Sequence, residues 1–492
     1  QPTPSANLCR RNDLNVHEGL SQEQNSLMTK KSQPTNRSRT PSSEKFMEFV
    51  GSNWGEFDAL ELTRWPVADF TKARRETIAS EFPGKVLIFE ASEPRVRSND
   101  SDYRYRPDSA FVYFTGWGSQ SVPGSALVID ARGQVPESTL YLRPTAGKDS
   151  DEFFANPAIG EFWVGQRPSL GQIELQLGIK TRDIAEFETD AKSWEAILDK
   201  DSEDLVQKAS EIRFIKDDHE IAELKKAVAV TVTGFAEVAR AIPRATRHPR
   251  GERVVETAFF SVARQHAYDL GYDTIAASGK NACILHWTRN DGEVKSGDLI
   301  LVDAGAEVDS LYTADVTRTI PVSGKFSKEQ LFVYEAVLEA ADAAFAAVKP
   351  GALFRDVHNA AIAVIAQKVS ELGLIPVTPV EALDPDNQHH RRYMVHGTSH
   401  HLGLDVHDCA KARREMYQDG VLEPGMVFTI EPGLYFHEND LLVPEAYRGI
   451  GVRIEDDVLV TETGYENLSA GLPRSASGIE DWFSQALLGG AG

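Results

Sequence analysis

Short apolar runs separated by turn residues organise the first half of the chain. Each run is rich in β-branched and aromatic residues and is bounded by Gly, Pro, Asp or Ser, a pattern typical of short strands. The runs lie at residues 85–92, 109–117, 125–133 and 138–144. We therefore predict a mixed α/β domain in this part of the chain.

A helical period replaces this pattern after residue 216. Asp217 or Asp218 can cap a helix there, because a short side-chain oxygen can accept a bond from the first free backbone N–H groups. Pro243 predicts the end of that helix. The apolar positions that follow the helical spacing are Ile221, Leu224, Val228, Val232 and Phe235.

The second half of the chain again alternates strand-like runs with helices, but without strict βαβ order. One long helix is expected over 354–373. The strand-like runs are 298–305, 314–322, 426–436 and 453–462. This order favours an α+β domain with a largely antiparallel sheet.

These patterns divide the chain into four segments. Residues 1–44 are rich in Ser, Thr, Pro, Asn and Gln and lack an apolar period, which predicts a disordered tail. Residues 45–215 form the predicted α/β domain, and residues 216–480 form the predicted α+β domain. Residues 481–492, which end in GGAG, are expected to be a flexible tail.

Composition excludes some classes of partner. The chain has 52 Lys and Arg against 74 Asp and Glu, a formal net charge of −22, so its field repels nucleic acid and anionic membranes. No stretch approaches the roughly 18 apolar residues of a membrane span. Three cysteines, Cys9, Cys283 and Cys409, form an odd set without a CxxC unit, which fits a reducing compartment. We therefore expect a cytoplasmic protein.

Four carboxylates interrupt apolar runs of the second domain, and one histidine-rich segment lies between them. They are Asp303, Asp315, Glu431 and Glu455, and the histidine is His400. A buried, ionised carboxylate needs a pairing cation, hydrogen bonds or a metal. Taken singly, each acid is more often a turn cap or half of an ion pair, for which Arg318 or Arg453 is available.

Taken together, the five residues favour a metal site. Oxygen-rich ligands with one imidazole suit Mn²⁺ or a similar ion, and the imidazole also admits Zn²⁺ or Co²⁺. Two cations that share bridging carboxylates would explain how so much negative charge is buried together. A glycosidase also places acids near apolar walls, but it needs two carboxylates rather than four with a histidine.

Four segments carry a resemblance to a known family. The segments VDAGAEVDSLYTADVTRTIPVSGKF, HGTSHHLGLDVHD, LEPGMVFTIEPGLYF and YRGIGVRIEDDVLVTETGYENLS resemble the aminopeptidase P group of the pita-bread metallopeptidases. That fold also includes prolidase, methionine aminopeptidase and the metal-free creatinase. The resemblance is strongest over 270–470 and extends to the first domain through RVRSNDSDYRYRPDSAFVYFTGW and EFWVGQRPSLG. It implies a pita-bread catalytic domain after residue 216 and a creatinase-like or aminopeptidase P-like domain before it.

The resemblance also implies a role for each candidate ligand. Asp303 would hold one metal ion, His400 and Glu431 would hold the other, and Asp315 and Glu455 would bridge the two. A hydroxide between the metals would be the nucleophile, since a metal pair lowers the pKa of bound water and polarises the scissile carbonyl. Glu431 would be the general base and proton shuttle. Asp303 and Asp315 lie twelve residues apart, one more than in better-known members, which predicts a longer loop between them.

Further residues match positions that line the active site in the family. His286 and His407 would hydrogen-bond the substrate or stabilise the oxyanion, and Arg453 would act beside them. The substrate-binding positions are Asp100 for the free α-amine, Tyr272 and His396 beside the proline pocket, Tyr435, and Trp163. Trp163 would approach the site of a neighbouring subunit, although simple packing is an equal alternative.

The function that the resemblance implies is removal of the amino-terminal residue from peptides whose second residue is proline. An Xaa-Pro bond lacks an N–H, so a pocket shaped for the pyrrolidine ring can select it. The family implies two divalent metal ions, expected to be Mn²⁺, and a homodimer or homotetramer. Two alternatives stay open: a prolidase that cleaves only Xaa-Pro dipeptides, and a non-catalytic pita-bread protein that binds peptides.

Overall fold

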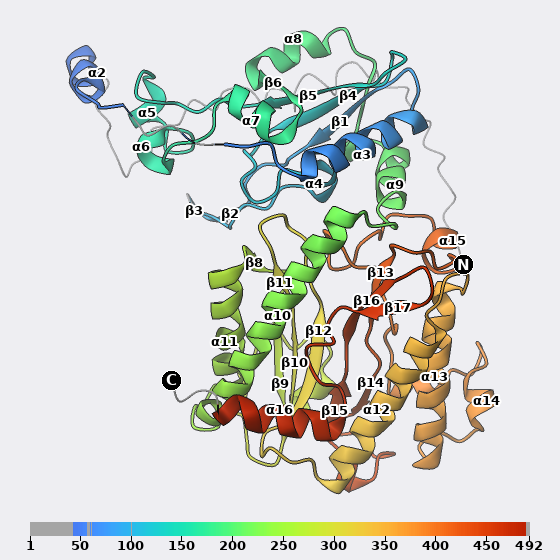
Figure 1. Ribbon diagram of the computed structural model, residues 1–492. Helices are drawn as coiled ribbons and strands as arrows, with labels where there is room; N and C mark the ends of the chain where they lie inside the picture. The colour runs from blue at the N-terminus through green and yellow to red at the C-terminus, as the bar shows by residue number, and fades with distance from the viewer. Residues whose placement is uncertain (1–42, 57–59, 61, 100, 489–492) are drawn as a thin grey trace, which may run out of the picture.

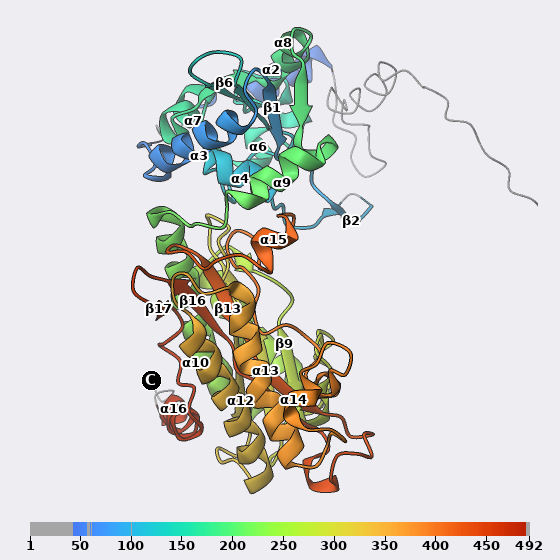
Figure 2. The ribbon, with the colours of Figure 1, turned by 90° about the vertical axis from the view of Figure 1, so that its right-hand side faces the viewer.

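The computed structural model describes residues 43–488, apart from residues 57–59, 61 and 100. Two groups of elements are stacked end to end, and both views show the first group beyond one end of the second (Figure 1, Figure 2). Residues 1–42 of the predicted tail (1–44) lie outside the described residues, so the tail stays a prediction there. Ser43 caps the first described helix, α2 (Glu44–Gly51).

The first domain contains a five-stranded mixed sheet in the order β6-β5-β4-β1-β7. The β1–β4 and β4–β5 pairs are antiparallel, while β1–β7 and β5–β6 are parallel. The strands are β1 (Val86–Glu90), β4 (Ala126–Asp130), β5 (Glu137–Leu142), β6 (Lys180–Asp183) and β7 (Ala196–Leu198). The predicted mixed α/β architecture is therefore confirmed.

The run at 109–117, which was predicted to be a strand, forms helix α4 (Ser109–Thr115) instead. Asp108 decides this, because its carboxylate accepts hydrogen bonds from the N–H groups of Ala110 and Phe111 at the start of the helix. Gly116 ends the helix with a φ of 71°, a left-handed conformation that glycine adopts without strain. Local caps thus override the strand propensity of the aromatic residues between them.

Other short elements complete the first domain. A small hairpin, β2 and β3, extends from it toward the second domain (Figure 1). The elements are β2 (Val96–Ser98), β3 (Ser101–Asp102), α3 (Val67–Glu81), α5 (Glu152–Ala155), α6 (Glu161–Val164), α7 (Leu170–Leu177), α8 (Phe187–Ala191) and α9 (Glu203–Glu211).

The strands of the second domain form antiparallel pairs, as predicted. Two three-stranded sheets have the orders β12-β10-β9 and β13-β16-β17, and β11–β8 and β14–β15 are separate pairs. The strands are β8 (Asp269–Leu270), β9 (Ile275–Ser278), β10 (Leu299–Ala304), β11 (Ala306–Glu307), β12 (Val316–Pro321), β13 (Val427–Ile430), β14 (Gly433–Phe436), β15 (Ile450–Arg453), β16 (Asp456–Val460) and β17 (Tyr465–Asn467).

Two pairs of long helices flank these strands (Figure 1). Helix α10 (Asp218–Ala245) packs on α11 (Gly251–His266), and α12 (Lys328–Ala347) packs on α13 (Phe354–Glu371). The short helices are α14 (Pro379–Ala382) and α15 (Arg414–Tyr417). The long helix expected over 354–373 is thereby confirmed.

The start of α10 follows the prediction, and its end does not. Asp217 is the N-cap and forms a capping box with Glu220. Pro243 lies inside the helix, which continues to Ala245. A proline this close to the end removes a hydrogen bond from the last turn only, so the helix is not broken there.

The end of the chain differs from the flexible tail expected over 481–492. Residues up to Leu488 belong to helix α16 (Ala476–Leu488), which crosses the end of the second domain remote from the first (Figure 1). Phe483 and Ala486 are buried in the main hydrophobic core, and this apolar contact stabilises the helix. Residues 489–492 lie outside the described residues.

Partly buried ion pairs join the two domains. Arg106 Nε lies 2.7 Å from Glu307 Oε2, and Arg74 Nη2 lies 2.7 Å from Asp217 Oδ2. Among the described residues, no helix is long and apolar enough to cross a membrane. Cys283 and Cys409 are both buried and free.

Candidate metal centre

Asp303 and Asp315 are brought together by one antiparallel strand pair. Asp303 lies within β10, opposite Thr317 of β12, and Asp315 directly precedes β12. Gly305 permits the close approach of the chains, because a Cβ there would lie 1.7 Å from the carbonyl oxygen of Ala314. The turn after Asp303 therefore places two carboxylates on one side of the sheet.

The other three candidate ligands come from the second half of the domain. The N–H of Thr429, in β13, donates to the carbonyl of His400 at 2.9 Å, and the N–H of Glu431 donates to Thr398 at 2.8 Å. The N–H of Glu455 donates to the carbonyl of Thr317 at 3.1 Å. The first two bonds join the segments of His400 and Glu431 to each other, and the third holds Glu455 against β12.

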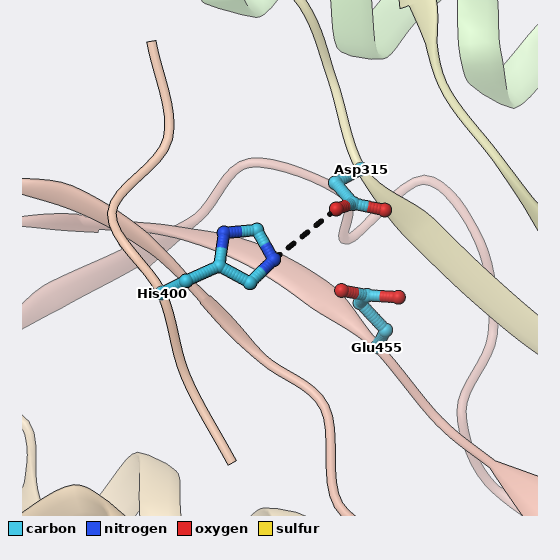
Figure 3. A group of neighbouring side chains, drawn as sticks. All are labelled: Asp315, His400 and Glu455. Carbon is cyan, nitrogen blue, oxygen red and sulfur yellow. Dashed lines mark ion pairs between the residues drawn. The ribbon is translucent and has the colours of Figure 1, made fainter. Parts of the chain in front are cut away.

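The side chains of Asp315, His400 and Glu455 point toward one another from separate segments (Figure 3). Each offers a ligand atom, and these atoms lie within 4.8 Å of one another. His400 Nε2 is 3.3 Å from Asp315 Oδ2 and 3.6 Å from Glu431 Oε1. Asp315, Glu431 and Glu455 thus all lie close to His400, so four of the five predicted ligands are neighbours.

Asp303 joins the cluster through Tyr272 and Arg453. The Tyr272 hydroxyl lies 2.7 Å from Asp303 Oδ1 and 2.5 Å from Asp315 Oδ1. Arg453 Nη2 donates to Asp303 Oδ2 at 2.5 Å. The ion pair that was the alternative interpretation of a single acid therefore exists for Asp303, whereas Arg318 pairs with Asp456 at 2.7 Å.

The pKa values of the site acids show how unfavourable this concentration of charge is. Burial, followed by repulsion from Asp315 and Glu431, raises the pKa of Glu455 well above its usual range. Burial also raises the pKa of Asp303, although Arg453 opposes it, and raises the pKa of Glu431 to about 7. Divalent cations would relieve this repulsion, so the donor set fits the metal ions that the sequence predicts.

The orientation of His400 also fits a metal ligand. Its Nδ1 lies 3.2 Å from the carbonyl oxygen of His401, and its Nε2 faces the carboxylates. A backbone acceptor at one ring nitrogen is the usual way in which a protein fixes the tautomer of a metal-binding histidine. Burial lowers the pKa of His400, but the bond to Asp315 and the charge of Glu431 outweigh burial and raise it to about 9.

A cavity of about 560 Å³ opens on this cluster. Apolar side chains of Ile275, Leu285 and Val406 form part of its wall. The predicted site residues that line it are Tyr272, His286, Asp303, Asp315, His396, His400, His407, Glu431, Arg453 and Glu455. Ten of the predicted positions, from both halves of the domain, therefore share one cavity.

Two further predicted residues, Tyr435 and Trp163, do not line this cavity. Tyr435 is buried behind it, with its hydroxyl 2.8 Å from His396 Nε2 and 3.0 Å from Arg453 Nη1. Trp163 lies on α6 of the first domain, is 54% exposed, and donates its indole N–H to the carbonyl of Phe154. Asp100 lies outside the described residues.

Two residues that contact the ligands were missed by the sequence analysis. The Thr317 hydroxyl donates to Glu455 Oε2 at 2.6 Å, and Asp457 Oδ2 accepts the N–H of Asp315 at 3.2 Å. Side chains two residues apart on a strand share a face, so Thr317 could have been found from its spacing to Asp315. The same spacing places Asp457 on the face of Glu455, which lies two residues before it, so Asp457 could have been found in the same way.

Known proteins resemble this chain over most of its length. Xaa-Pro aminopeptidase 1 of Streptomyces coelicolor is 44% identical over 461 residues, which are 90% of this chain and 92% of that protein. The Xaa-Pro aminopeptidase of Escherichia coli is 32% identical over 84% of this chain and 96% of its own length. Residues 222–462 match metallopeptidase family M24, and residues 71–200 match the aminopeptidase P N-terminal domain. The chain belongs to metallopeptidase family M24.

Solved structures support the same assignment for this M24 protein. A variant of Escherichia coli aminopeptidase P superposes with a TM-score of 0.75 at 30% identity, over 85% of this chain and 98% of that one. Zinc-substituted Escherichia coli aminopeptidase P in complex with product gives a TM-score of 0.74. The second domain therefore has the pita-bread fold, and the enzyme is a metal-dependent hydrolase of the aminopeptidase P group.

Proposed function

We propose that this M24 enzyme hydrolyses the amino-terminal Xaa-Pro bond of peptides with the aid of two divalent metal ions. The observation that carries the proposal is that the five predicted ligands, four carboxylates and one imidazole, line one cavity. It is supported by relatives named Xaa-Pro aminopeptidase that are 44% identical over 90% of the chain.

The proposed ligand assignment is the one that the family resemblance implies, and the shared cavity supports it. Asp315 and Glu455, which belong to the central cluster beside His400, would bridge the two ions. Asp303 would hold one ion, and His400 and Glu431 would hold the other. Four carboxylates compensate the charge of two divalent ions, and we propose Mn²⁺ because its preferred ligands are oxygen atoms. When bound, the ions supply an activated water and polarise the scissile carbonyl.

Glu431 is the proposed general base. Its Oε1 lies 3.6 Å from His400 Nε2, and its Oε2 lies 3.6 Å from His396 Nδ1, at the edge of the cavity. Without metal ions, burial raises its pKa to about 7, and bound cations would lower that pKa. Its carboxylate lines the cavity, so it would be placed to take a proton from water and to deliver it to the leaving amine.

His286 and His407 are the proposed donors to the developing oxyanion. Both line the cavity, and the His407 ring lies edge-on to His400 with ring centroids 4.4 Å apart. Burial lowers the pKa of His407, so this imidazole is neutral at pH 7 and can donate one N–H. Arg453 positions Tyr435 and Asp303 at the back of the site.

The proposed proline pocket is flanked by Tyr272 and His396, and Tyr435 lies behind His396. The Tyr272 hydroxyl is engaged by two carboxylates, so its ring is held in place as part of the cavity wall. His396 is held in turn by Tyr435. Burial lowers the pKa of His396 to about 3, which keeps the ring uncharged beside an apolar pyrrolidine.

Other parts of the proposal concern the substrate amine and the assembly. We propose that Asp100 binds the free α-amine, that Trp163 approaches a neighbouring subunit, and that the enzyme forms a homodimer or homotetramer. The 54% exposure of Trp163 supports a contact outside its own chain. A cytoplasmic location is supported by the buried free thiols Cys283 and Cys409.

The experiment that tests this function measures hydrolysis of Arg-Pro-Pro and of the dipeptide Arg-Pro by metal-stripped enzyme that has been resupplied with Mn²⁺. We expect release of Arg from the tripeptide, restored by the metal and absent in Asp315→Asn. Cleavage of the dipeptide alone would favour a prolidase. Inertness of the folded, metal-loaded enzyme toward both peptides would contradict the proposal.

A further inference from the structure

Glu252, in the first turn of α11, is completely buried and does not line the metal-site cavity. Each of the two carboxylate oxygens accepts two hydrogen bonds. All four donors come from the segment 278–292. Oε1 accepts from the Ser278 N–H and from Asn281 Nδ2, both at 2.8 Å, and Oε2 accepts from Trp287 Nε1 at 2.7 Å and from the Gly292 N–H at 2.6 Å. Among the described residues, no cation forms an ion pair with Glu252.

The contact between the Glu252 carboxylate and the backbone N–H of residue 292 requires a glycine at position 292. A Cβ at position 292 would lie 2.7 Å from Glu252 Oε2 and 2.5 Å from Asn281 Nδ2, so only glycine lets the backbone N–H approach. An ionised carboxylate offers about four acceptor positions, and neutral N–H donors use all of them here. The side chain thus ties together four points of one segment.

The segment that Glu252 holds forms a wall of the metal-site cavity. Leu285, His286 and Thr288 line the cavity, and His286 is exposed to it. No group among the described residues hydrogen-bonds the His286 ring, so its direction follows from the backbone around Trp287. Asn290 anchors the other end of this wall, where it accepts the N–H of Ala276 and donates to the carbonyl of Thr274.

We propose that Glu252 is a positioning residue for the hydrolysis, which holds the segment 278–292 so that His286 faces the substrate. This inference rests on the role proposed above for His286. It needs no contact between Glu252 and the metal ligands. A displacement of about 1 Å in a group that contacts the transition state costs on the order of a hundredfold in rate.

The substitution Glu252→Gln tests this role at nearly constant volume. The amide keeps one acceptor oxygen but turns an NH₂ group toward two N–H donors, so two of the four bonds are lost. We expect kcat for Arg-Pro-Pro to fall about 10- to 100-fold with little change in KM, because the lost interaction acts in the transition state. The metal content after dialysis should equal that of the unsubstituted enzyme. Glu252→Asp keeps the charge and should restore part of kcat.

A double-mutant cycle with His286→Ala separates positioning from general stabilisation. If Glu252 acts through His286, the double variant should have a kcat within about twofold of that of His286→Ala alone. Effects that multiply would overturn the positioning role. The matched control is Glu220→Gln, another buried glutamate in the first turn of a helix, which should lower the melting temperature without coupling to His286.

The Trp287 indole N–H gives a readout that is independent of activity. Its signal in ¹⁵N-tryptophan-labelled enzyme is identified by its loss in Trp287→Phe. We expect this signal to shift in Glu252→Gln and to stay in place in His286→Ala, and an unshifted signal in Glu252→Gln would contradict the contact. If Glu252→Gln does not fold, Trp287→Phe removes one of the four bonds and should show the same dependence on His286.

The kinetic outcomes distinguish the two proposals. If His286→Ala lowers kcat and Glu252→Gln does not, the positioning role of Glu252 is wrong and the role of His286 stands. If His286→Ala leaves kcat unchanged, both assignments are wrong, although Xaa-Pro hydrolysis itself is still tested by the metal-restored cleavage of Arg-Pro-Pro.

Discussion

Asp408 and Glu455 are both almost inaccessible to solvent, at 1% and 2% exposure, but their pKa values move in opposite directions. Burial acts to raise the pKa of Asp408, but Arg213 and Lys216 outweigh it, and the pKa falls below its usual range. Burial and then neighbouring carboxylates raise the pKa of Glu455 well above its usual range. The protein's own cations neutralise Asp408, whereas the charge of Glu455 is left for a bound metal ion to neutralise.

The same contrast separates two consecutive residues. Glu455 faces the metal centre, whereas Asp456 faces away from it and forms an ion pair with the fully buried Arg318. Successive side chains of an extended segment point to opposite sides, so one short run of acids serves two purposes. In this short run, the acid that lacks a protein cation faces the metal centre, and the acid that has one faces the structural core.

The largest effect is expected when a site acid is neutralised. Asp315→Asn should reduce hydrolysis of Arg-Pro-Pro about ten-thousandfold or more, because a bridging ligand is lost. The free energy of unfolding of metal-stripped enzyme should change little, because Asp315 repels Glu455 but also pairs with His400. Activity, metal content and urea unfolding with a chelator measure these changes. Full metal content with full activity would show that Asp315 is no ligand.

Removing a cation that pairs with a structural acid should lower the stability of the metal-free enzyme. Arg318→Met leaves the buried Asp456 with only the longer ion pair to Arg474, at 3.6 Å, and this should lower the free energy of unfolding by about 3 kcal/mol. Urea unfolding of metal-free enzyme measures the loss. The double variant Arg318→Met, Asp456→Asn is the control and should recover part of the stability. Equal stability of the enzyme and Arg318→Met would contradict the distinction between the two faces.

A smaller effect is expected from Thr317, which holds a ligand without being one. Thr317→Val keeps the shape and removes the hydroxyl that donates to Glu455 Oε2. Loss of a hydrogen bond to a metal ligand should weaken metal affinity or activity about 10- to 100-fold. Activity titrated with Mn²⁺ measures the affinity, and Thr319→Val, on the same strand and face, is the matched control.

Glu307 is an intermediate case, with one cation at the joint between the domains. Burial raises its pKa to about 7, although Arg106 opposes this. The folded state therefore binds this proton more tightly than the unfolded state, so the stability contributed by Glu307 is lost as the pH rises from about 4.5 to 7. Across this range, the free energy of unfolding of the enzyme should fall by on the order of 2 kcal/mol relative to that of Glu307→Gln. The free energy of unfolding is measured by urea unfolding at each pH for the enzyme and for Glu307→Gln. The same pH dependence in both proteins would contradict this prediction.

Much of the fold and most of the site could be predicted from local signals. The strands that contain or adjoin Asp303 and Asp315 were recognisable because apolar runs end on tight turns there. Helix α4 was misread because its aromatic residues favour strands, while the cap at Asp108 was overlooked. Helix α16 was missed because only contact with the core makes Phe483 a buried position.

The sequence by itself determined the proposed chemistry of this enzyme: the five proposed ligand residues, their order along the chain and the caps that start its helices. The tertiary structure alone decided which acid meets which partner, as when Arg453 contacts Asp303 and Arg318 contacts Asp456. It also brought Glu252 onto the wall that carries His286. The physical reason is that the cost of a buried charge depends on groups that are distant in sequence, and only folding brings them within a few ångströms.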